Sequence, residues 1–512
     1  MSTERTAGQR SPGARAWAVV AAHPDAVALS IVVLAAATMR VAFAFRVPVF
    51  LLRDSISYFL PAWDLLYGYG FDLSIRRTPV YPLFISGALG LFGEDLLAVA
   101  FAQHLLGIAS AVLVYLLGRM TLGRAAGLLA ALVTALNGAL VIAEHYLMPE
   151  VALIFLLLLT FVVFVGALRS GRRAGFAASG VLLGLSLLCK PVAEVLIPVL
   201  PFVVAVSYAS IRRAILPSLT IGAGVLVVVV PWMVRNQLVH DSATTAGALG
   251  QTLLARTAKH DTGFKWYDDQ DADTYERREG IARQLVQNGI KQRLSDGVIY
   301  RRVQDRFGMT DAEVNQFMRV LATDVILDNP LYYLRGNVRF TWQLLAGEPE
   351  KLSTDWKTQN ARLSRDEWDD RVEHLLSRAS TAQRNELDEA STVVSLVQPP
   401  AWDPLMPILF GLGTLLFAIR ATMRPALLFS LAVLALLATC AALDGPVVRY
   451  RYPADPLMAL VAAGAVTWTA ELSLRLLRRA GAPRTAPTPS APLSSPSSPL
   501  VAPAPGRAPR GA

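Results

Sequence analysis

Charged residues recur at the ends of long apolar segments, and their types suit chemistry at a membrane surface. The stretch RDSISYFLPAW places Arg53 and Asp54 directly after an apolar run. Ionisable groups at such positions are costly and tend to mark function. A carboxylate such as Asp54 can take the proton of an acceptor hydroxyl while a new bond forms. The pair therefore raises the possibility of catalysis at the edge of a bilayer.

Other charged residues lie in the short polar segments between the apolar runs. Arginine and lysine bind phosphate groups, and cations stabilise the charge that develops on a phosphate leaving group. Carboxylates and cations in one pocket would provide the parts for transfer of a group from a lipid phosphate to a hydroxyl. The set is Arg53, Asp54, Arg76, Arg77, Glu144, His145, Glu150, Lys190, Glu194, Arg235, Arg449 and Arg451.

Several of these residues also allow a structural interpretation. Asp54 could cap a helix that begins near Ser55, and Arg76 and Arg77 could extend from the membrane interface to water. The aromatic Tyr58 could stack on a sugar or an acyl chain, although anchoring at the interface is the commoner role. Both interpretations stay open for each residue.

The stretch EHYLMPE could be an ordinary loop or could contact substrate through Glu144, His145 and Glu150. The same three residues are the candidate ligands if a divalent metal ion is a cofactor, but adjacent side chains diverge on regular structure. Lys190 lies beside a proline between two apolar runs, where an anionic ligand is favoured over a structural ion pair. Arg40, inside the first apolar run, is expected to pair with a buried carboxylate.

Ten apolar segments are expected to position these residues as membrane-spanning helices. A span needs roughly 20 mostly apolar residues, and 54% of the 512 residues are hydrophobic. Both cysteines, Cys189 and Cys440, fall in apolar segments and are expected to serve packing. The predicted fold class is an all-α polytopic membrane protein. The predicted spans are 27–46, 97–118, 125–143, 151–168, 175–189, 192–209, 215–234, 402–419, 425–443 and 456–473.

The distribution of arginine orients these spans. With the N-terminus inside, the inner loops RMTLGR, RSGRRAG, IRRA and RATMR are basic and nearly free of acid, in agreement with the positive-inside rule. Both termini are then cytoplasmic, and Asp54 lies on the extracytoplasmic face of the plasma membrane. The net charge of +9 is explained by such loops, so nucleic acid is not expected as a partner.

The polar segments suggest a domain organisation. A capping box at Thr310 and Glu313, a second at Ser364 and Glu367, and Asn329 before a proline are helix start signals. Residues 79–93 are apolar but short, which favours a helix in the outer interface. The predicted domains are a cytoplasmic tail (1–26), a transmembrane module (27–234) with its first outer loop (47–96), an extracytoplasmic helical domain (235–400), C-terminal transmembrane helices (401–474) and a disordered cytoplasmic tail rich in Pro, Ala and Ser (475–512).

Taken in order, several stretches resemble the membrane glycosyltransferases of the C-type fold (GT-C), which use a polyprenyl-phosphate sugar. The resemblance is greatest to the protein O-mannosyltransferases and the lipid A aminoarabinose transferase, and it covers most of 38–240 and 445–465. The matching stretches are MRVAFAFRVPVFLLRDSISY, RRTPVYPLFISGALGLFG, YLMPEVALIFLLLLTF, LLCKPVAEVLIPVLPF, VVPWMVRNQLV and RYRYPADPLMALVAA.

The resemblance implies roles for the charged residues. Asp54 would be the catalytic base of an inverting, in-line transfer. Glu150, with Glu144 and His145, would lie near substrate or metal, although the chain shows no clear DxD pair. Arg449 and Arg451 are, with Tyr58, further candidates for substrate contact. The expected donor-phosphate ligands are Arg53, Arg76, Arg77 and Lys190.

Three hypotheses for the function are compared. The leading hypothesis is transfer of a sugar from a polyprenyl-phosphate donor to a hydroxyl or amine of an extracytoplasmic glycan, lipid or protein. A transporter or flippase for lipid or sugar would need polar residues at mid-depth in several spans, and the spans here are mostly apolar there. A non-catalytic scaffold for envelope assembly would act through its outer domain.

Overall fold

The computed structural model of the chain describes residues 22–44, 49–52, 54–261, 264, 278–294, 296–347 and 402–480. All regular elements among these residues are helices, and one isolated parallel bridge joins Phe50 and Tyr146. Contacts divide the chain into two units, Met1–Trp468 and Thr469–Ala512. The first unit carries all the candidate residues, and the second contains the end of the last helix.

Seven of the described helical segments are long and apolar enough to cross a membrane. The predicted fold class, an all-α polytopic membrane protein, is therefore confirmed. The seven segments are Pro24–Val41 in α2 (Pro24–Ala44), α5 (Leu96–Thr121), α8 (Glu150–Ser170), Pro191–Tyr208 in η1 (Pro191–Val195) and α10 (Leu196–Tyr208), α11 (Ile211–His240), Met423–Leu443 in η5 (Ala421–Ala426) and α20 (Leu427–Leu443), and Asp455–Arg478 in α21 (Asp455–Ala480).

The other predicted spans form shorter apolar helices. The spans predicted at 175–189 and 402–419 correspond to α9 (Arg173–Cys189) and α19 (Trp402–Ile419). The span predicted at 125–143 is broken into α6 (Arg124–Ala135) and α7 (Gly138–Ala143). The Asn137 side chain causes the break, because it accepts hydrogen bonds from Ala139 N at 3.0 Å and Leu140 N at 3.4 Å and so starts a new helix.

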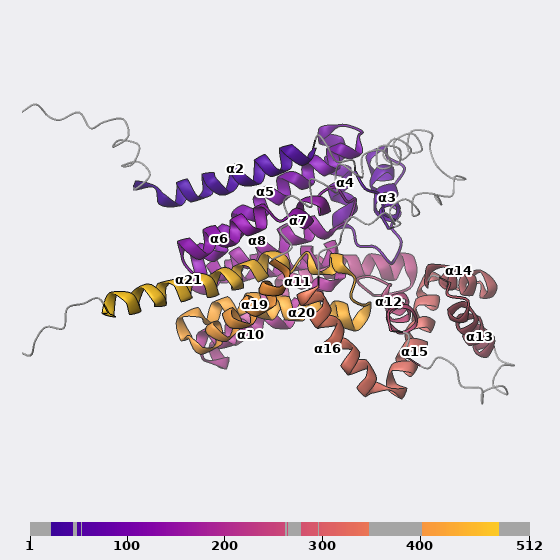
Figure 1. Cartoon of the computed structure of the whole chain (residues 1–512). Coiled ribbons are helices and arrows are strands. Elements are labelled where there is room, and N and C mark those ends of the chain that lie inside the picture. The colour runs from indigo at the N-terminus through magenta and orange to yellow at the C-terminus, as the bar shows by residue number, and fades with distance from the viewer. Residues whose placement is uncertain are drawn as a thin grey trace, which may run out of the picture. The chain divides into compact units, whose positions relative to one another are not determined.

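Close packing of small residues holds the helices of the bundle together. Helix α5 packs against α2, α6 and α8 (Figure 1). Helix α9 packs against α8 and α11. A Cβ at Gly118 of α5 would lie 2.4 Å from Gly127 Cα of α6, and one at Gly180 of α9 would lie 2.1 Å from the Ile221 carbonyl oxygen of α11. Only glycine permits these approaches, which is typical of helix contacts in membranes.

Two short helices lie between α2 and α5. Helices α3 (Ile56–Leu66) and α4 (Val80–Phe92) pack on each other, and the rings of Tyr58 and Tyr81 meet edge to face at 5.4 Å. Leu91 of α4 is 80% exposed. An interfacial position for α4 stays a prediction, although its exposed leucine suits contact with lipid.

A second, smaller hydrophobic cluster forms within 249–328. It is built by α12 (Leu249–Ala255), a π-helical turn (Arg256–His260), α13 (Arg278–Lys291), α14 (Asp296–Phe307) and α15 (Asp311–Asp328). The capping box predicted at Thr310 and Glu313 is confirmed at the start of α15. The one predicted at Ser364 and Glu367 lies outside the described residues.

Helices α11 and α16 (Pro330–Ala346) connect the region predicted as the outer domain (235–400) to the bundle. Helix α11 continues to His240, past the predicted end of its span at 234. Helix α16 contacts the smaller cluster through Tyr332 and the main core through Phe340 and Leu344. The segment after α11 is thus joined to the bundle by side-chain packing, while its assignment as a domain stays a prediction.

Candidate active site

Asp54 lies just before α3, and both of its carboxylate oxygens contact guanidinium groups. Arg77 Nη2 donates to Oδ1 at 3.0 Å, and Arg449 Nη2 donates to Oδ2 at 3.4 Å. The residue at the N-terminal cap of α3 is Ser55, whose hydroxyl accepts from Leu52 N at 2.8 Å. The Asp54 side chain therefore pairs with two arginines, and the capping interpretation is not supported.

Arg77 is fixed by the first turn of α3. Its Nε donates to Ser57 Oγ at 2.8 Å, its Nη1 donates to Tyr58 Oη at 3.1 Å, and its guanidinium lies 4.5 Å from the centre of the Tyr58 ring. A planar guanidinium held at three nitrogens has little freedom, so its position relative to Asp54 is set before any ligand binds.

Glu150, the first residue of α8, is a second carboxylate that contacts cations near Asp54. Lys190 Nζ donates to Glu150 Oε1 at 2.7 Å, and Arg449 Nε lies 3.9 Å from the same oxygen. The Glu150 side chain is 3% exposed, and its Oε2 has no hydrogen-bond partner among the described residues. A negative charge is favoured at the N-terminus of α8, which partly offsets the cost of burial.

The ring of Tyr450 lies close to two of these cations, Lys190 and Arg449. Lys190 Nζ lies 4.9 Å and the Arg449 guanidinium 5.6 Å from the centre of its ring. Its hydroxyl donates to Asp444 Oδ2, and Asp444 Oδ1 lies 3.6 Å from His260 Nε2. We call Asp54, Arg77, Glu150, Lys190 and Arg449 the charged cluster. Through Asp444 and Tyr450, the π-helical turn that ends at His260 is connected to this cluster.

The charges of the cluster are not balanced. Three cations (Arg77, Lys190, Arg449) face two carboxylates (Asp54, Glu150), which leaves one excess positive charge. Burial raises the pKa of Asp54, but Arg77 and Arg449 outweigh burial and hold the pKa below the ordinary value of 3.8. The cluster therefore contains an ionised carboxylate at neutral pH and favours an anionic ligand.

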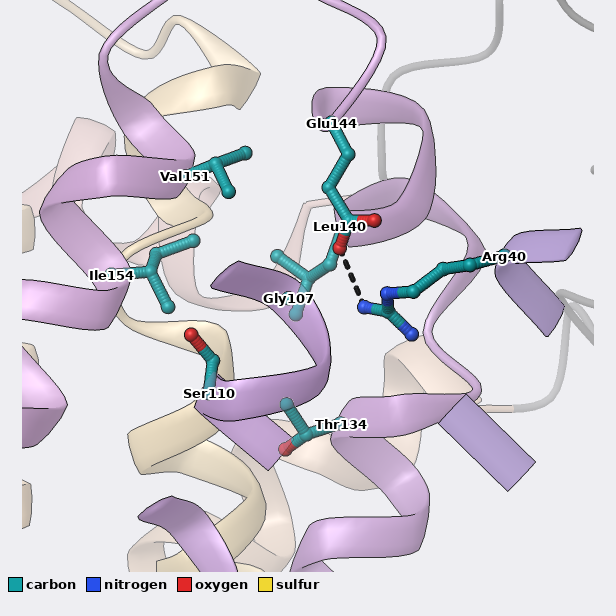
Figure 2. A pocket seen from close by; sticks show the side chains of 8 residues that line it. All are labelled: Arg40, Gly107, Ser110, Thr134, Leu140, Glu144, Val151 and Ile154. Carbon is teal, nitrogen blue, oxygen red and sulfur yellow. Dashed lines mark hydrogen bonds and ion pairs between the residues drawn. The ribbon is translucent and has the colours of Figure 1, made fainter. Parts of the chain in front are cut away.

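Glu144 and His145 are held elsewhere in the bundle. Glu144 Oε1 accepts from Arg40 Nη2 at 2.5 Å, and Glu144 Oε2 lies 2.5 Å from His104 Nδ1. Figure 2 shows Arg40 and Glu144 joined across a small pocket between the helices. The expectation that Arg40 pairs with a buried carboxylate matches this contact, and Glu144 pairs with these two residues rather than with the charged cluster. The His145 ring lies against that of His104 at 4.8 Å.

The remaining predicted residues have other contacts. Arg76 Nη1 donates to Gln251 Oε1 at 2.6 Å and its guanidinium lies 4.9 Å from the centre of the Tyr300 ring, so this side chain faces α12 and α14. Arg451 donates to Asp455 Oδ1 at 2.8 Å and to the Gly347 carbonyl oxygen. Arg53 lies outside the described residues.

Two further residues of the set predicted on the outer face, Arg235 and Glu194, contact residues outside the charged cluster. Arg235 Nη1 donates to the Leu73 carbonyl oxygen at 3.0 Å, and Glu194 Oε1 accepts from the Thr245 hydroxyl at 2.5 Å. Among the described residues, no three or more His, Cys, Asp or Glu side chains are grouped so that they could hold a metal ion. Glu144, His145 and Glu150 accordingly do not form a ligand set in this part of the chain.

Sequence reasoning missed Tyr450, Asp444 and His260. The repeated pattern RYRY offered a signal for Tyr450, because an aromatic ring next to an arginine often packs on cations. Asp444 directly follows an apolar run, as Asp54 does, and could have been selected by the same criterion. His260 lies in a polar segment without such a signal.

Comparison with known proteins supports the resemblance found in the sequence. Residues 76–234 match the family model described as dolichyl-phosphate-mannose-protein mannosyltransferase. The matched segment contains Arg77, Glu150 and Lys190 but not Asp54 or Arg449. The resemblance to the protein mannosyltransferases is thus confirmed over this segment. No curated protein matches the chain.

Solved structures of membrane transferases are similar at low sequence identity. Archaeal oligosaccharyltransferase AglB from Archaeoglobus fulgidus, in complex with an inhibitory peptide and a dolichol-phosphate, is 15% identical over 92% of this chain and 53% of that chain, with a TM-score of 0.46. ArnT from Cupriavidus metallidurans, bound to undecaprenyl phosphate, is 13% identical over 92% of this chain and 82% of that chain, with a TM-score of 0.38. This chain spans about half the length of the AglB chain.

Proposed function

We propose that the protein is a GT-C type membrane glycosyltransferase that transfers a sugar from a polyprenyl-phosphate donor to an extracytoplasmic hydroxyl or amine. One observation carries the proposal: Asp54 is held between Arg77 and Arg449, beside the pair of Lys190 and Glu150. The family match over residues 76–234 supports the reaction class.

The proposed reaction is a single displacement at the anomeric carbon of the donor. The acceptor oxygen or nitrogen forms a bond to this carbon, and the bond from the carbon to the phosphate oxygen breaks. Asp54 takes the acceptor proton, and the polyprenyl phosphate leaves with the electron pair. Attack opposite the leaving group inverts the configuration of the sugar.

The cations are proposed to bind the phosphate of the donor. Arg77, Arg449 and Lys190 now pair with carboxylates, and a phosphate entering the cluster would share these partners. The excess positive charge favours its entry, and the same cations stabilise the charge that grows on the leaving phosphate. We assign Arg449 to this set, while the contacts of Arg76 with Gln251 and Tyr300 favour a role at α12 and α14.

The polyprenyl tail is proposed to stay in the bilayer while its phosphate reaches the charged cluster. The location proposed for the cluster is the extracytoplasmic face of the plasma membrane, with both termini in the cytoplasm. The excess of arginine in the inner loops supports this orientation. The acceptor class is a glycan, a lipid or a protein that carries a hydroxyl or an amine.

The test uses the full-length protein in lipid nanodiscs with a radiolabelled polyprenyl-phosphate sugar and extracted envelope acceptors. We expect Asp54→Asn to slow transfer by about a hundredfold or more, the usual size of general-base catalysis, and to leave donor binding measurable. Asp64→Asn, near the C-terminal end of α3, is a matched control and should keep the wild-type rate. Transfer by Asp54→Asn at that same rate would refute the proposed function.

A further inference from the structure

Arg40, Glu144 and His104 form a buried ionic group that the proposed chemistry does not use. The side chains of Arg40 and Glu144 are 4% and 2% exposed and lie 2.5 Å apart. Arg40 Nη1 also donates to the carbonyl oxygens of Ala36 and Ala135, each at 3.2 Å. Figure 2 shows the pair meeting between helices that are far apart in the chain.

The neighbouring glycine indicates that the bundle is built around this pair. A Cβ at Gly107 of α5 would lie 2.0 Å from Glu144 Oε1 and 2.6 Å from Arg40 Nη2. Any other residue at this position would push into the two charged groups. Buried ion pairs rarely stabilise a fold more than apolar residues of the same volume, so stability alone does not account for the group.

Both members of the pair lie just before segments that carry carboxylates of the charged cluster. Arg40 is near the end of α2, before Asp54, and Glu144 caps the end of α7, before Glu150. The two segments are joined by backbone hydrogen bonds. Phe50 N donates to the His145 carbonyl oxygen at 2.8 Å, and Leu147 N donates to the Phe50 carbonyl oxygen at 3.2 Å.

A side chain of α5 reinforces the same region. Gln103 Nε2 donates to the carbonyl oxygens of Glu144 at 2.7 Å and Tyr146 at 2.9 Å. Gln103 Oε1 accepts from Tyr81 Oη at 3.1 Å, and the Tyr81 ring packs against Tyr58, which contacts Arg77. Hydrogen bonds and ring contacts thus run from the buried group to the charged cluster.

We infer that Arg40, Glu144 and His104 are positioning residues that hold the segments before Asp54 and Glu150 in a fixed register. The inference rests on the proposed function for its catalytic consequence. Lys190 and Arg449 are carried by other segments, so loss of the buried group should leave these two phosphate ligands in place. The chemical step should then slow while donor binding is retained.

The first experiment measures backbone hydrogen exchange and needs no activity. Replacing both members of the pair, in Arg40→Met with Glu144→Met, removes the ion pair without leaving an unpaired arginine or glutamate. We expect exchange at the amides of Phe50 and Leu147 to speed up at least tenfold. Phe176→Leu, which removes part of a buried ring at the contact of α8 and α9, controls for general loss of stability and should leave both amides as protected as before.

Gly107→Ala provides a second variant in case the double variant does not fold. It inserts a methyl group at the ion pair while both charges remain, and the same increase in exchange is expected. Unchanged protection of Phe50 and Leu147 in a folded variant of either kind would overturn the inference. This outcome is independent of whether the protein transfers sugar.

The second experiment measures turnover per donor-binding site. The Arg40→Met/Glu144→Met variant should keep the Kd for the polyprenyl-phosphate sugar within about threefold of wild type, while kcat falls at least tenfold. Phe176→Leu should lower the melting temperature without changing kcat per binding site. Wild-type kcat in the double variant would reject a positioning role, whereas absence of transfer by the wild-type protein would reject the proposed function alone.

Discussion

Arg449 donates to Asp54 Oδ2 at 3.4 Å, although the two residues are 395 positions apart in the chain. The contact joins the segment after the first membrane helix to the segment before the last. Arg449 also lies 3.9 Å from Glu150, so one guanidinium contacts both carboxylates of the charged cluster. The cluster is therefore complete only when the C-terminal helices have packed against the N-terminal ones.

The pH dependence of turnover should report the environment of Asp54. A general base acts in its ionised form, so the acid limb of the kcat profile of the wild-type protein should lie below the ordinary pKa of 3.8. Arg77→Gln removes the strongest influence that lowers this pKa, while burial, which raises it, remains. The acid limb should therefore move to higher pH in Arg77→Gln.

The stability of the protein should follow the same direction. A carboxylate with a lowered pKa stabilises the fold above its unfolded pKa, and this contribution disappears as pH falls through the folded pKa. Wild-type protein should keep the contribution to a lower pH than Arg77→Gln in melting experiments. In the turnover measurement described above, an acid limb of the kcat profile that does not move in Arg77→Gln would show that another group limits turnover.

Two cations with different contacts provide a test of phosphate binding. Lys190→Met should raise the KM for the donor roughly ten- to hundredfold, because a hydrogen bond between charged groups contributes about 1.5–3 kcal/mol. Arg76→Gln is the matched control, since Arg76 contacts Gln251 and Tyr300. Its donor KM should stay within about twofold of wild type in steady-state kinetics. An equal rise of the donor KM in both variants would contradict the assignment of Lys190, rather than Arg76, to the phosphate.

Two glycine substitutions should have opposite effects on stability. Gly107→Ala places a methyl group against Arg40 and Glu144 and should cost about 1–3 kcal/mol, as overpacking does. Gly87→Ala in α4 meets nothing within 4 Å and should stabilise by about 0.5–1 kcal/mol because alanine favours helix. Unfolding in mixed detergent micelles measures both, and equal changes would contradict the close approach at Gly107.

The capping box of α15 should be a local determinant of stability. Thr310 Oγ1 accepts from Glu313 N at 3.3 Å, and Glu313 Oε2 accepts from Thr310 N at 2.8 Å. Thr310→Ala should destabilise this helix by about 1 kcal/mol, while Thr310→Ser keeps the hydroxyl and should be close to neutral. Faster hydrogen exchange at the Glu313 amide in Thr310→Ala alone would demonstrate the effect.

Much of the fold follows from apolar length, because membrane spans depend on continuous hydrophobic segments. The segments predicted at 97–118 and 151–168 are helices with ends only a few residues away. The break at Asn137 was not predicted, since one polar side chain that starts a helix has little weight in a window of apolar residues. The end of α11 at His240 was missed because polar residues can continue a helix beyond the membrane.

The sequence predicted which residues belong to the candidate site better than it predicted which of them contact each other. Asp54, Arg77 and Lys190 were selected as ionisable residues next to apolar runs, and they do lie together with Arg449. The separation of Arg76 from Arg77 could not be foreseen, because neighbouring side chains diverge according to local backbone geometry. The pairing of Glu144 with Arg40 and His104 depends on helix packing, which spacing does not reveal.

The length of α11 has a consequence for how the surrounding lipid influences the protein. Its 30 residues extend about 45 Å if straight, whereas the hydrocarbon layer of a bilayer is about 30 Å thick. Near its end, Arg235 and His240 both contact the Leu73 carbonyl oxygen, four residues before Arg77. A thinner or thicker bilayer that changes the tilt of α11 would displace the backbone at Leu73 and with it the guanidinium of Arg77. Membrane thickness would then tune turnover mechanically.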